Sequence, residues 1–181
     1  MSGFVNAAAQ YRQLLQLGRD EFLAAAAPAA LVRYRVDLDE SAAASGASTL
    51  TLEDGDPGDY ASIDETLPHG KILPDQVDLE VYPLTKKPGA SFPDRITIGR
   101  TSNNDVVIAD SSVSRLHAYV RRDGARWVVA DAGSKNGSWL GGVTLGARRE
   151  TPLPSRAILR IGDVDLTFYV ATDLYGALGG T

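Results

Sequence analysis

Three short polar segments carry the side chains of this chain that are best suited to bind an anion. They are Ile98-Gly99-Arg100, Val113-Ser114-Arg115-Leu116-His117 and Gly133-Ser134-Lys135-Asn136-Gly137-Ser138. Each lies at the end of a run of β-forming residues, so a β-sandwich could bring the three together. They supply guanidinium groups, hydroxyls, an ammonium group and an amide, all of which donate hydrogen bonds. This set suits the binding of a phosphate and of the peptide that carries it, and does not suit cutting or forming bonds.

Arg100 and Ser114 are the groups best matched to a dianionic phosphate. Gly99 stands just before Arg100, and the lack of a side chain there lets another group approach the strand end closely. Ser114 is followed directly by Arg115, so a hydroxyl and a guanidinium are adjacent. Hydrogen bonds to charged groups contribute roughly 1.5–3 kcal/mol each. The planar fork of arginine also fits phosphate oxygens better than the point charge of lysine.

The composition of the 181-residue chain excludes several kinds of site. It has no cysteine, which removes disulfides, thiolate zinc sites and cysteine nucleophiles. Its two histidines, His69 and His117, are too few for a histidine-rich metal site, so we expect no metal. The longest apolar run, Leu23 to Val32, contains Pro28 and is far shorter than the ~20 residues of a membrane span. No basic region precedes an apolar N-terminal core, so we expect no signal peptide and a soluble, cytoplasmic protein.

Charge is distributed unevenly along the chain. Residues 1–80 carry 5 Lys or Arg and 14 Asp or Glu, a net charge of −9, whereas residues 81–181 carry 13 and 9, a net charge of +4. A mildly basic half is typical of a module that meets anionic ligands. The excess is too small, and aromatic residues are too few, to indicate a nucleic-acid surface.

Residues 1–36 form the first part of the chain and show helical periodicity. Apolar residues recur at spacings of three, four or seven: Phe4, Ala8, Tyr11, Leu15 and Phe22. This pattern predicts one amphipathic helix from about Phe4 to Ala27, limited by Pro28. A single helix cannot bury its own apolar stripe. It must therefore dock on the rest of the chain, on a second copy or on a partner.

Residues 37–75 have the composition of an acidic linker. Nine acidic residues and no basic one lie between Arg35 and Lys71. The run from Ser41 to Ser48 is of low complexity, and the run from Asp54 to Asp59 is turn-forming. Low hydrophobicity with high net charge cannot offset the entropy of ordering a chain, so we expect a flexible linker.

Residues 76–171 contain short β-rich runs separated by turn residues, with no helical period and no βαβ alternation. The runs are Val77–Leu84, Arg95–Ile98, Val106–Ile108, Ala118–Arg121, Trp127–Ala130, Trp139–Leu140, Ala157–Ile161 and Asp165–Val170. Short strands at close, fairly even spacing are typical of an antiparallel β-sandwich. Residues 172–181 are left as a C-terminal tail.

The ordered set of motifs resembles the forkhead-associated (FHA) domain, a β-sandwich module that binds phosphothreonine peptides. The family signature is Gly-Arg, then Ser-x-x-His, then Asn-Gly. This chain carries it at Gly99-Arg100, Ser114-Arg115-Leu116-His117 and Asn136-Gly137, and Asn104-Asp105-Val106 also fits the pattern. The resemblance covers roughly residues 77–170. It implies an all-β, FHA-like sandwich, here preceded by an N-terminal helical segment and an acidic linker.

The resemblance also implies a role for each matching residue. Arg100 and Ser114 would contact the phosphate directly, and Arg115 would be a second cationic contact. Asn136 would hydrogen-bond the backbone of the bound peptide. Lys135 would contact the phosphate or acidic residues of the ligand. The architectural residues would be Gly99, His117 and Gly137.

Other readings of these residues remain. Taken singly, Arg100 and Lys135 are ordinary solvated loop residues, and Ser114 could make only a local turn bond. The pair Asn136-Gly137 is a strong hairpin signal, which is compatible with a peptide contact. Ser138 stands where the family often has threonine, a departure that affects packing more than binding.

A hydrolase built on Ser114, His117 and Asp131 is a further reading of the same residues. We reject it because the sequence has no nucleophile elbow. The resemblance makes His117 a support for the binding loops instead.

We therefore expect a non-catalytic adaptor that recognises phosphothreonine in partner proteins, within Ser/Thr kinase-linked signalling or a kinase-controlled assembly. It needs no cofactor, binds no nucleic acid and has no membrane span. The alternative is a phosphate-independent scaffold that assembles through the sandwich and the N-terminal helix. The linker also carries a candidate ligand, because Thr66 lies in the acidic stretch Asp64-Glu65-Thr66-Leu67. Phosphorylated by a kinase, Thr66 would fold back onto Arg100 and Ser114.

Overall fold

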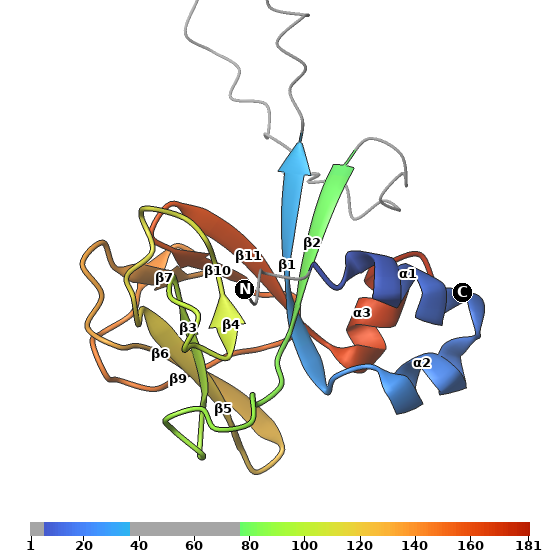
Figure 1. Ribbon diagram of the computed structural model, residues 1–181, viewed down its shortest axis with the longest axis horizontal. Helices are drawn as coiled ribbons and strands as arrows, with labels where there is room; N and C mark the ends of the chain where they lie inside the picture. Colours follow the sequence, from blue (N-terminus) through green and yellow to red (C-terminus); the bar gives the residue numbers. More distant parts are fainter. Residues whose placement is uncertain (1–5, 37–76) are drawn as a thin grey trace, which may run out of the picture.

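Two β-sheets face each other, and a layer of helices covers part of the outer face of one of them (Figure 1). The computed structural model describes residues 6–36 and 77–181. The six-stranded sheet has the order β2-β1-β11-β10-β7-β8, with β1 Ala29–Val36, β2 Val77–Pro83, β7 Ser138–Leu140, β8 Val143–Thr144, β10 Ile158–Ile161 and β11 Val164–Val170. The five-stranded sheet has the order β4-β3-β5-β6-β9, with β3 Ile96–Gly99, β4 Val106–Val107, β5 Ala118–Asp123, β6 Arg126–Asp131 and β9 Thr151–Pro152.

The predicted all-β sandwich is confirmed, and every predicted strand is present within a residue or two of its expected ends. The sequence missed β8 and β9, which have two residues each and are too short to show alternation. It also predicted antiparallel pairing throughout. The pair β3–β4 is parallel, with Ile98 opposite Val106.

The main core lies between the two sheets. Strand β10 shows the pattern that builds it, because Leu159 and Ile161 are fully buried while Arg160 between them points outward. Trp127 of β6 packs edge-to-face on Phe168 of β11, with ring centroids 5.7 Å apart. This contact joins the two sheets.

Residues 29–36 correct the sequence-based picture. They were expected in the helical segment, but they form β1, which lies between β2 and β11 in the sheet. Ala29 and Leu31 belong to the main core, whereas Ala30 and Val32 belong to a second cluster on the outer face of the sheet. A strand buried on both faces appears as a continuous apolar run, which periodicity alone cannot distinguish from a helix.

The helical layer also differs from the prediction of one N-terminal helix and a C-terminal tail. Two helices, α1 Ala8–Gln16 and α2 Arg19–Ala25, are separated at Gly18, which has a φ of 99°. A third helix, α3 Ala171–Ala177, lies in the part expected to be a tail. The division of the chain at residues 36, 75 and 171 stays a prediction, although β1 and α3 pack with the strands between 77 and 170.

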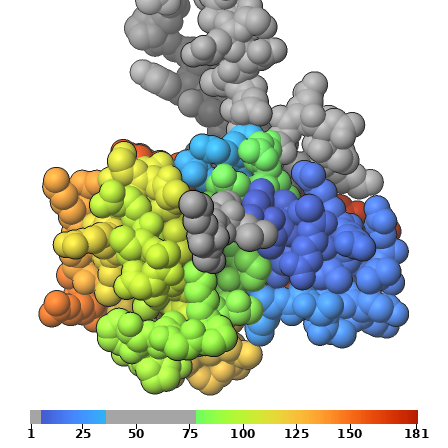
Figure 2. All heavy atoms as spheres, in the orientation of Figure 1, coloured from blue at the N-terminus to red at the C-terminus, as the bar shows by residue number. Residues whose placement is uncertain are grey.

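The N-terminal helices dock on the chain's own sheet. Phe22 is fully buried, and its ring lies edge-to-face on Tyr11, at 5.7 Å, and on Tyr175, at 5.2 Å. These rings pack on the outer side of β1 and β2, where Val32 and Val81 lie. The apolar residues of the N-terminal helices are therefore buried against the chain's own sheet. In the space-filling view the blue residues of α1 and α2 lie on the right, and the yellow to orange strands and loops of the sandwich lie on the left (Figure 2).

Strands β1 and β2 form an antiparallel hairpin whose register runs from Ala30 opposite Pro83 to Val36 opposite Val77. The predicted linker, with Thr66, lies outside the described residues. Val36 and Val77, the residues that flank this segment in the sequence, are therefore paired at one end of the hairpin. The segment is an insertion between two neighbouring strands, whereas the sequence had placed it between two separate parts of the protein.

Candidate functional site

Three loops of the sandwich surround one surface depression with a volume of about 610 Å³. They follow β3, β4 and β6 and span residues 100–105, 108–117 and 132–137. The structure brings together all five residues predicted to bind a ligand, and they line this depression: Arg100, Ser114, Arg115, Lys135 and Asn136. The sequence did not predict the other lining residues, which are Ser111, Ser112, Val113, Leu116 and Gly133.

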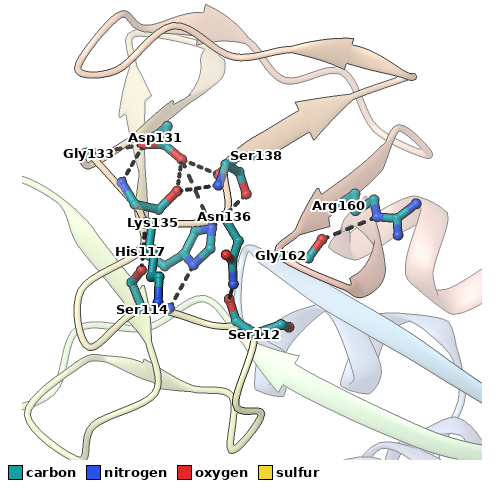
Figure 3. A network of polar contacts seen from close by, with 12 residues as sticks. Ser112, Ser114, His117, Asp131, Gly133, Lys135, Asn136, Ser138, Arg160 and Gly162 are labelled. Atoms are coloured by element: carbon teal, nitrogen blue, oxygen red, sulfur yellow. Dashed lines mark hydrogen bonds and ion pairs between the residues drawn. The ribbon is translucent and has the colours of Figure 1, made fainter.

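Ser114 makes hydrogen bonds to the other two loops, and its contact with the loop that carries Lys135 is drawn in Figure 3. Its Oγ accepts a hydrogen bond of 3.0 Å from the backbone N–H of Lys135, and its carbonyl oxygen accepts one of 3.0 Å from the backbone N–H of Arg100. Because Oγ acts as an acceptor toward Lys135, the hydroxyl proton remains available to an incoming acceptor. The hydroxyl is thus held in place at the depression with a donor to offer.

His117 supports the loops from beneath and is fully buried. Its Nδ1 accepts a hydrogen bond of 2.9 Å from the backbone N–H of Ser114, so Nδ1 carries no proton. Its Nε2 then carries the proton and donates to the carbonyl oxygen of Gly137, at 2.9 Å. Burial lowers the pKa of His117 against the opposing effects of Gly137 and Asp131, which keeps the imidazole neutral. This arrangement agrees with the architectural role implied by the resemblance.

The same geometry disfavours a hydrolytic triad of Ser114, His117 and Asp131. The imidazole contacts the backbone N–H of Ser114, and Oγ is bound to Lys135 instead. Nε2 faces Gly137 and lies 4.0 Å from Oδ2 of Asp131. A serine nucleophile needs its hydroxyl within reach of a base. This trio lacks that contact.

Asp131 shapes the loop that carries Lys135 and Asn136. Its carboxylate accepts four hydrogen bonds of 2.6–2.8 Å, from the backbone N–H groups of Gly133 and Ser134 and from the hydroxyls of Ser134 and Ser138. Burial acts to raise the pKa of Asp131, but these hydrogen bonds outweigh it and the net shift is downward. In the sequence analysis, Asp131 appeared only as a member of the rejected hydrolytic triad. The signal it did carry was an aspartate two residues before a glycine, which is typical of an Asx-turn.

Asn136 is anchored at its side chain. Nδ2 donates to the carbonyl oxygen of Ser112 at 2.7 Å, which leaves Oδ1 and the second N–H of the amide for a ligand. The hydroxyl of Ser112 donates to Asp110 at 2.7 Å and accepts from the backbone N–H of Asp163 at 2.9 Å. Ser112 therefore connects the pocket to the β10–β11 turn. Sequence reasoning missed it, although a run of three serines within residues 111–114 marks a loop rich in donors.

Gly99 allows two loops to approach closely. A Cβ atom there would overlap the carbonyl oxygen of Arg115, so any other residue would displace the loop that carries Arg115. The same carbonyl accepts a hydrogen bond of 2.6 Å from Nδ2 of Asn104, which is buried. At the other loop, Gly137 has a φ of 87°, a conformation that favours glycine.

The cations of the depression are exposed. Within residues 6–36 and 77–181, the side chains of Arg100, Arg115 and Lys135 make no ion pair and no hydrogen bond. Mutually close cations without counter-ions create a positive potential that attracts an anion. The described part of the chain holds no cluster of three or more His, Cys, Asp or Glu able to bind a metal, and none of its helices is long and apolar enough to cross a bilayer.

Comparison with known proteins agrees with the motif resemblance. Residues 96–162 match the sequence model of the FHA domain, which confirms the family expected for this part of the chain. An FHA domain-containing protein of Arabidopsis thaliana is 30% identical over 81 residues, which are 44% of this chain and 20% of that protein. The chain thus spans about a fifth of the length of this curated relative.

Two solved structures illustrate the similarity. One is EmbR of Mycobacterium tuberculosis in complex with a low-affinity phosphopeptide, which is 28% identical, covers 50% of this chain and 22% of that chain, and has a TM-score of 0.43. The other is an FHA domain of an Arabidopsis thaliana protein, which is 26% identical, covers 51% of this chain and 74% of that chain, and has a TM-score of 0.42.

Proposed function

We propose that this chain, which carries an FHA domain over residues 96–162, is a phosphopeptide-binding adaptor that recognises phosphothreonine in partner proteins. FHA domains are phosphopeptide-recognition modules. The observation that carries the proposal is the convergence on one depression of a hydroxyl with a proton to donate, Ser114, and three cations that have no partner among the described residues: Arg100, Arg115 and Lys135.

The phosphate would be bound by these groups acting together. A phosphothreonine carries a charge of about −1.5 to −2 at neutral pH and offers three acceptor oxygens. Arg100 and Ser114 would donate to it directly, and Arg115 and Lys135 would add positive charge. Each charge-assisted bond contributes roughly 1.5–3 kcal/mol. No cofactor is needed, because the interaction is made of hydrogen bonds and charge alone.

Asn136 would bind the peptide rather than its phosphate. Its hydrogen bond to Ser112 fixes the amide, so little side-chain entropy is lost when Oδ1 and the remaining N–H meet a peptide group. Asn136 would therefore contribute to the affinity for the peptide backbone of the ligand, and Arg100 and Ser114 to the affinity for its phosphate.

The scaffold alternative is not favoured. It relied on an N-terminal helix with a free apolar stripe, but Tyr11 and Phe22 are buried against the chain's own sheet. It also gives no reason for the cations around Ser114 that have no partner in the described part of the chain.

The setting of the protein follows from its proposed ligand. Phosphothreonine is made by Ser/Thr kinases, so such a kinase would act upstream, in signalling or in control of an assembly. A non-catalytic role and a cytoplasmic location belong to the same proposal. They rest on the sequence and on the proposed ligand.

Thr66 is a candidate ligand within the chain. It lies 11 residues before Val77, a reach of up to about 36 Å at full extension. The hairpin from which this segment leaves is close to the pocket, because Arg33 of β1 forms an ion pair of 3.8 Å with Asp110, whose carboxylate accepts from Ser112. A tether of this kind gives effective concentrations near the millimolar range. If the phosphorylated chain bound an external phosphothreonine peptide as tightly as a Thr66→Ala chain treated with the same kinase, Thr66 would not be a ligand.

The proposed function is tested by screening the full chain against a phosphothreonine peptide library and against its unphosphorylated counterpart. Arg100→Ala is the test variant. Arg126→Ala is the matched control, because Arg126 is exposed at the far end of β6 from the depression. We expect phosphorylated members to bind the natural chain and the control more tightly than their unphosphorylated counterparts, and to show little such gain with Arg100→Ala. Binding of no phosphorylated member would refute the proposal.

A further inference from the structure

One side chain from outside residues 96–162 contacts the loop that carries Ser114. Arg33 lies on β1, and its Nη2 atom forms an ion pair of 3.8 Å with Oδ2 of Asp110, in the loop after β4. The two side chains are only 20% and 29% exposed, so salt and water screen this pair less than a pair on the open surface. The ion pair joins the β1–β2 hairpin to a loop that lines the depression.

Arg33 is also held on its other side. Glu80 stands opposite Arg33 in the register of β1 and β2, and its Oε2 lies 3.6 Å from Nη1 of the guanidinium. The hydroxyl of Tyr82 donates to the same oxygen at 2.8 Å. The guanidinium is planar and rigid. With Glu80 at one of its nitrogens and Asp110 at the other, it has a defined position between the hairpin and the loop.

Asp110 sets the conformation of Ser112. Its Oδ1 accepts from the backbone N–H of Ser112 at 2.9 Å and from the hydroxyl of Ser112 at 2.7 Å, which is the pattern of an Asx-turn. The two hydrogen bonds lower the pKa of Asp110, and the charge of Arg33 lowers it further. The carboxylate is therefore ionised at neutral pH, with Ser112 at one oxygen and Arg33 at the other.

Ser112 in turn holds the amide of Asn136. Its carbonyl oxygen accepts from Nδ2 of Asn136 at 2.7 Å, a bond that is drawn in Figure 3. Because Asp110 fixes both the N–H and the hydroxyl of Ser112, it also fixes the direction in which this carbonyl points. The backbone N–H of Asp163 holds the same hydroxyl at 2.9 Å, so the loss of one contact should loosen Ser112 without releasing it.

We propose that Arg33 is a positioning residue for Asn136, and that strand β1 is therefore part of the peptide-binding unit. The charge of Arg33 holds Asp110, and Asp110 orients Ser112. The carbonyl of Ser112 then orients Asn136. This inference rests on the proposed function and deepens it, because it adds to the site a strand that lies outside residues 96–162. One ion pair of this kind changes an affinity by about twofold to fivefold.

Two variants interrupt the path at different places. Arg33→Gln removes the charge that holds Asp110. Asp110→Asn keeps an oxygen that can accept from Ser112 and removes the charge that pairs with Arg33. The matched control is Arg35→Gln, because Arg35 lies two residues along the same strand and therefore on the same face. Arg35 pairs with Glu80 at 3.5 Å, and among the described residues it forms no ion pair with Asp110.

The first measurement needs no ligand. The exchange of the side-chain amide protons of Asn136 with water is followed by NMR in the natural chain and in each variant. Arg33→Gln and Asp110→Asn should each speed this exchange by about twofold to fivefold, because the bond to Ser112 opens more often. Arg35→Gln should leave it unchanged. Unchanged exchange in both test variants, or the same increase in the control, would refute the proposal.

The second measurement is calorimetry with the phosphothreonine peptide that binds the natural chain most tightly in the library screen. Arg33→Gln and Asp110→Asn should each weaken binding by about twofold to fivefold, and the double variant should be no weaker than either. Arg35→Gln should bind as the natural chain does. In an Asn136→Ala background, Arg33→Gln should add no further loss, which separates positioning of Asn136 from a general loss of stability.

The outcomes distinguish this inference from the proposed function. If the peptide binds and Arg33→Gln leaves its affinity unchanged, or if the full loss persists in the Asn136→Ala background, the positioning role is refuted and the proposed function stands. If no phosphorylated member binds the natural chain, the proposed function fails. The amide exchange then decides by itself whether Arg33 positions Asn136.

Discussion

The backbone N–H of Lys135 donates a hydrogen bond of 3.0 Å to Oγ of Ser114, which joins the loop after β6 to the loop after β4. One hydroxyl therefore fixes the relative position of two loops and still has a proton to donate to a ligand. Positioning and recognition are thus combined in one atom of a residue that sequence alone would allow to be a simple turn serine.

Ser114→Ala should reduce the affinity for a phosphothreonine peptide by at least tenfold. The variant loses one charge-assisted hydrogen bond, worth roughly 1.5–3 kcal/mol, and also frees the Lys135 loop. Ser111→Ala is the control, because Ser111 lines the same depression and is exposed. Calorimetry of both variants checks this, and an equal loss in both would contradict the role of Ser114.

Asn136→Ala should weaken phosphorylated and unphosphorylated forms of a peptide by the same factor. Asn136 would contact the peptide backbone, so its loss should leave the preference for phosphate unchanged. Removing its hydrogen bond to Ser112 should also lower the free energy of unfolding by about 1 kcal/mol. Titrations of both peptide forms decide the matter, and a selective loss for the phosphorylated form would place Asn136 on the phosphate instead.

The stability of the protein should fall as the pH drops from about 6.5 toward the lowered pKa of His117. Burial favours its neutral form, so in this range the unfolded chain binds more protons than the folded one, and the free energy of unfolding rises with pH. The contribution is complete above about pH 6.5 and is lost on acidification. The pKa values of Asp105, Asp110 and Asp131 are also lowered in the fold. Their contribution to the free energy of unfolding is therefore lost only as the pH falls below about 4.

Urea unfolding between pH 5 and 7, together with NMR titration of the His117 imidazole, checks this. A His117→Gln variant that folds should lose the pH dependence in that window. An imidazole pKa at or above its ordinary value would show that the assigned hydrogen-bonding pattern is wrong.

Phe22→Ala should lower the free energy of unfolding of the whole fold by about 3–5 kcal/mol, because it removes a buried ring from the layer over β1 and β2. Leu17→Ala is the control, since Leu17 is 58% exposed at the end of α1. Thermal unfolding of both measures the difference. A small effect of Phe22→Ala would mean that the helices contribute little to the stability of the sandwich.

The convergence of the three loops could be predicted from sequence, because the candidate binding residues occur as ordered motifs at strand ends. The supporting contacts could not be predicted. Asn136 bonds Ser112 across 24 residues, and the backbone N–H of Asp163 reaches the same serine across 51 residues. Such pairings depend on how the sheets are packed, and no local pattern records them.

The fold was predictable where strands alternate and not where they are buried on both sides. β10 alternates, with Leu159 and Ile161 buried around Arg160, and was found. β1 carries apolar residues on both faces, because helices cover its outer side, and such a run has no alternation to distinguish it from a helical segment. The break between α1 and α2 did have a local signal in Gly18, which the apolar periodicity across it outweighed.

The most direct test of phosphate recognition is one calorimetric cycle with the natural chain and Arg100→Ala, each titrated with the phosphorylated and the unphosphorylated form of one peptide. We expect the phosphate to strengthen binding to the natural chain and to add little in Arg100→Ala, with a coupling of roughly 1.5–3 kcal/mol between Arg100 and the phosphate. Equal strengthening by phosphate in both proteins, and hence no coupling, would contradict the account.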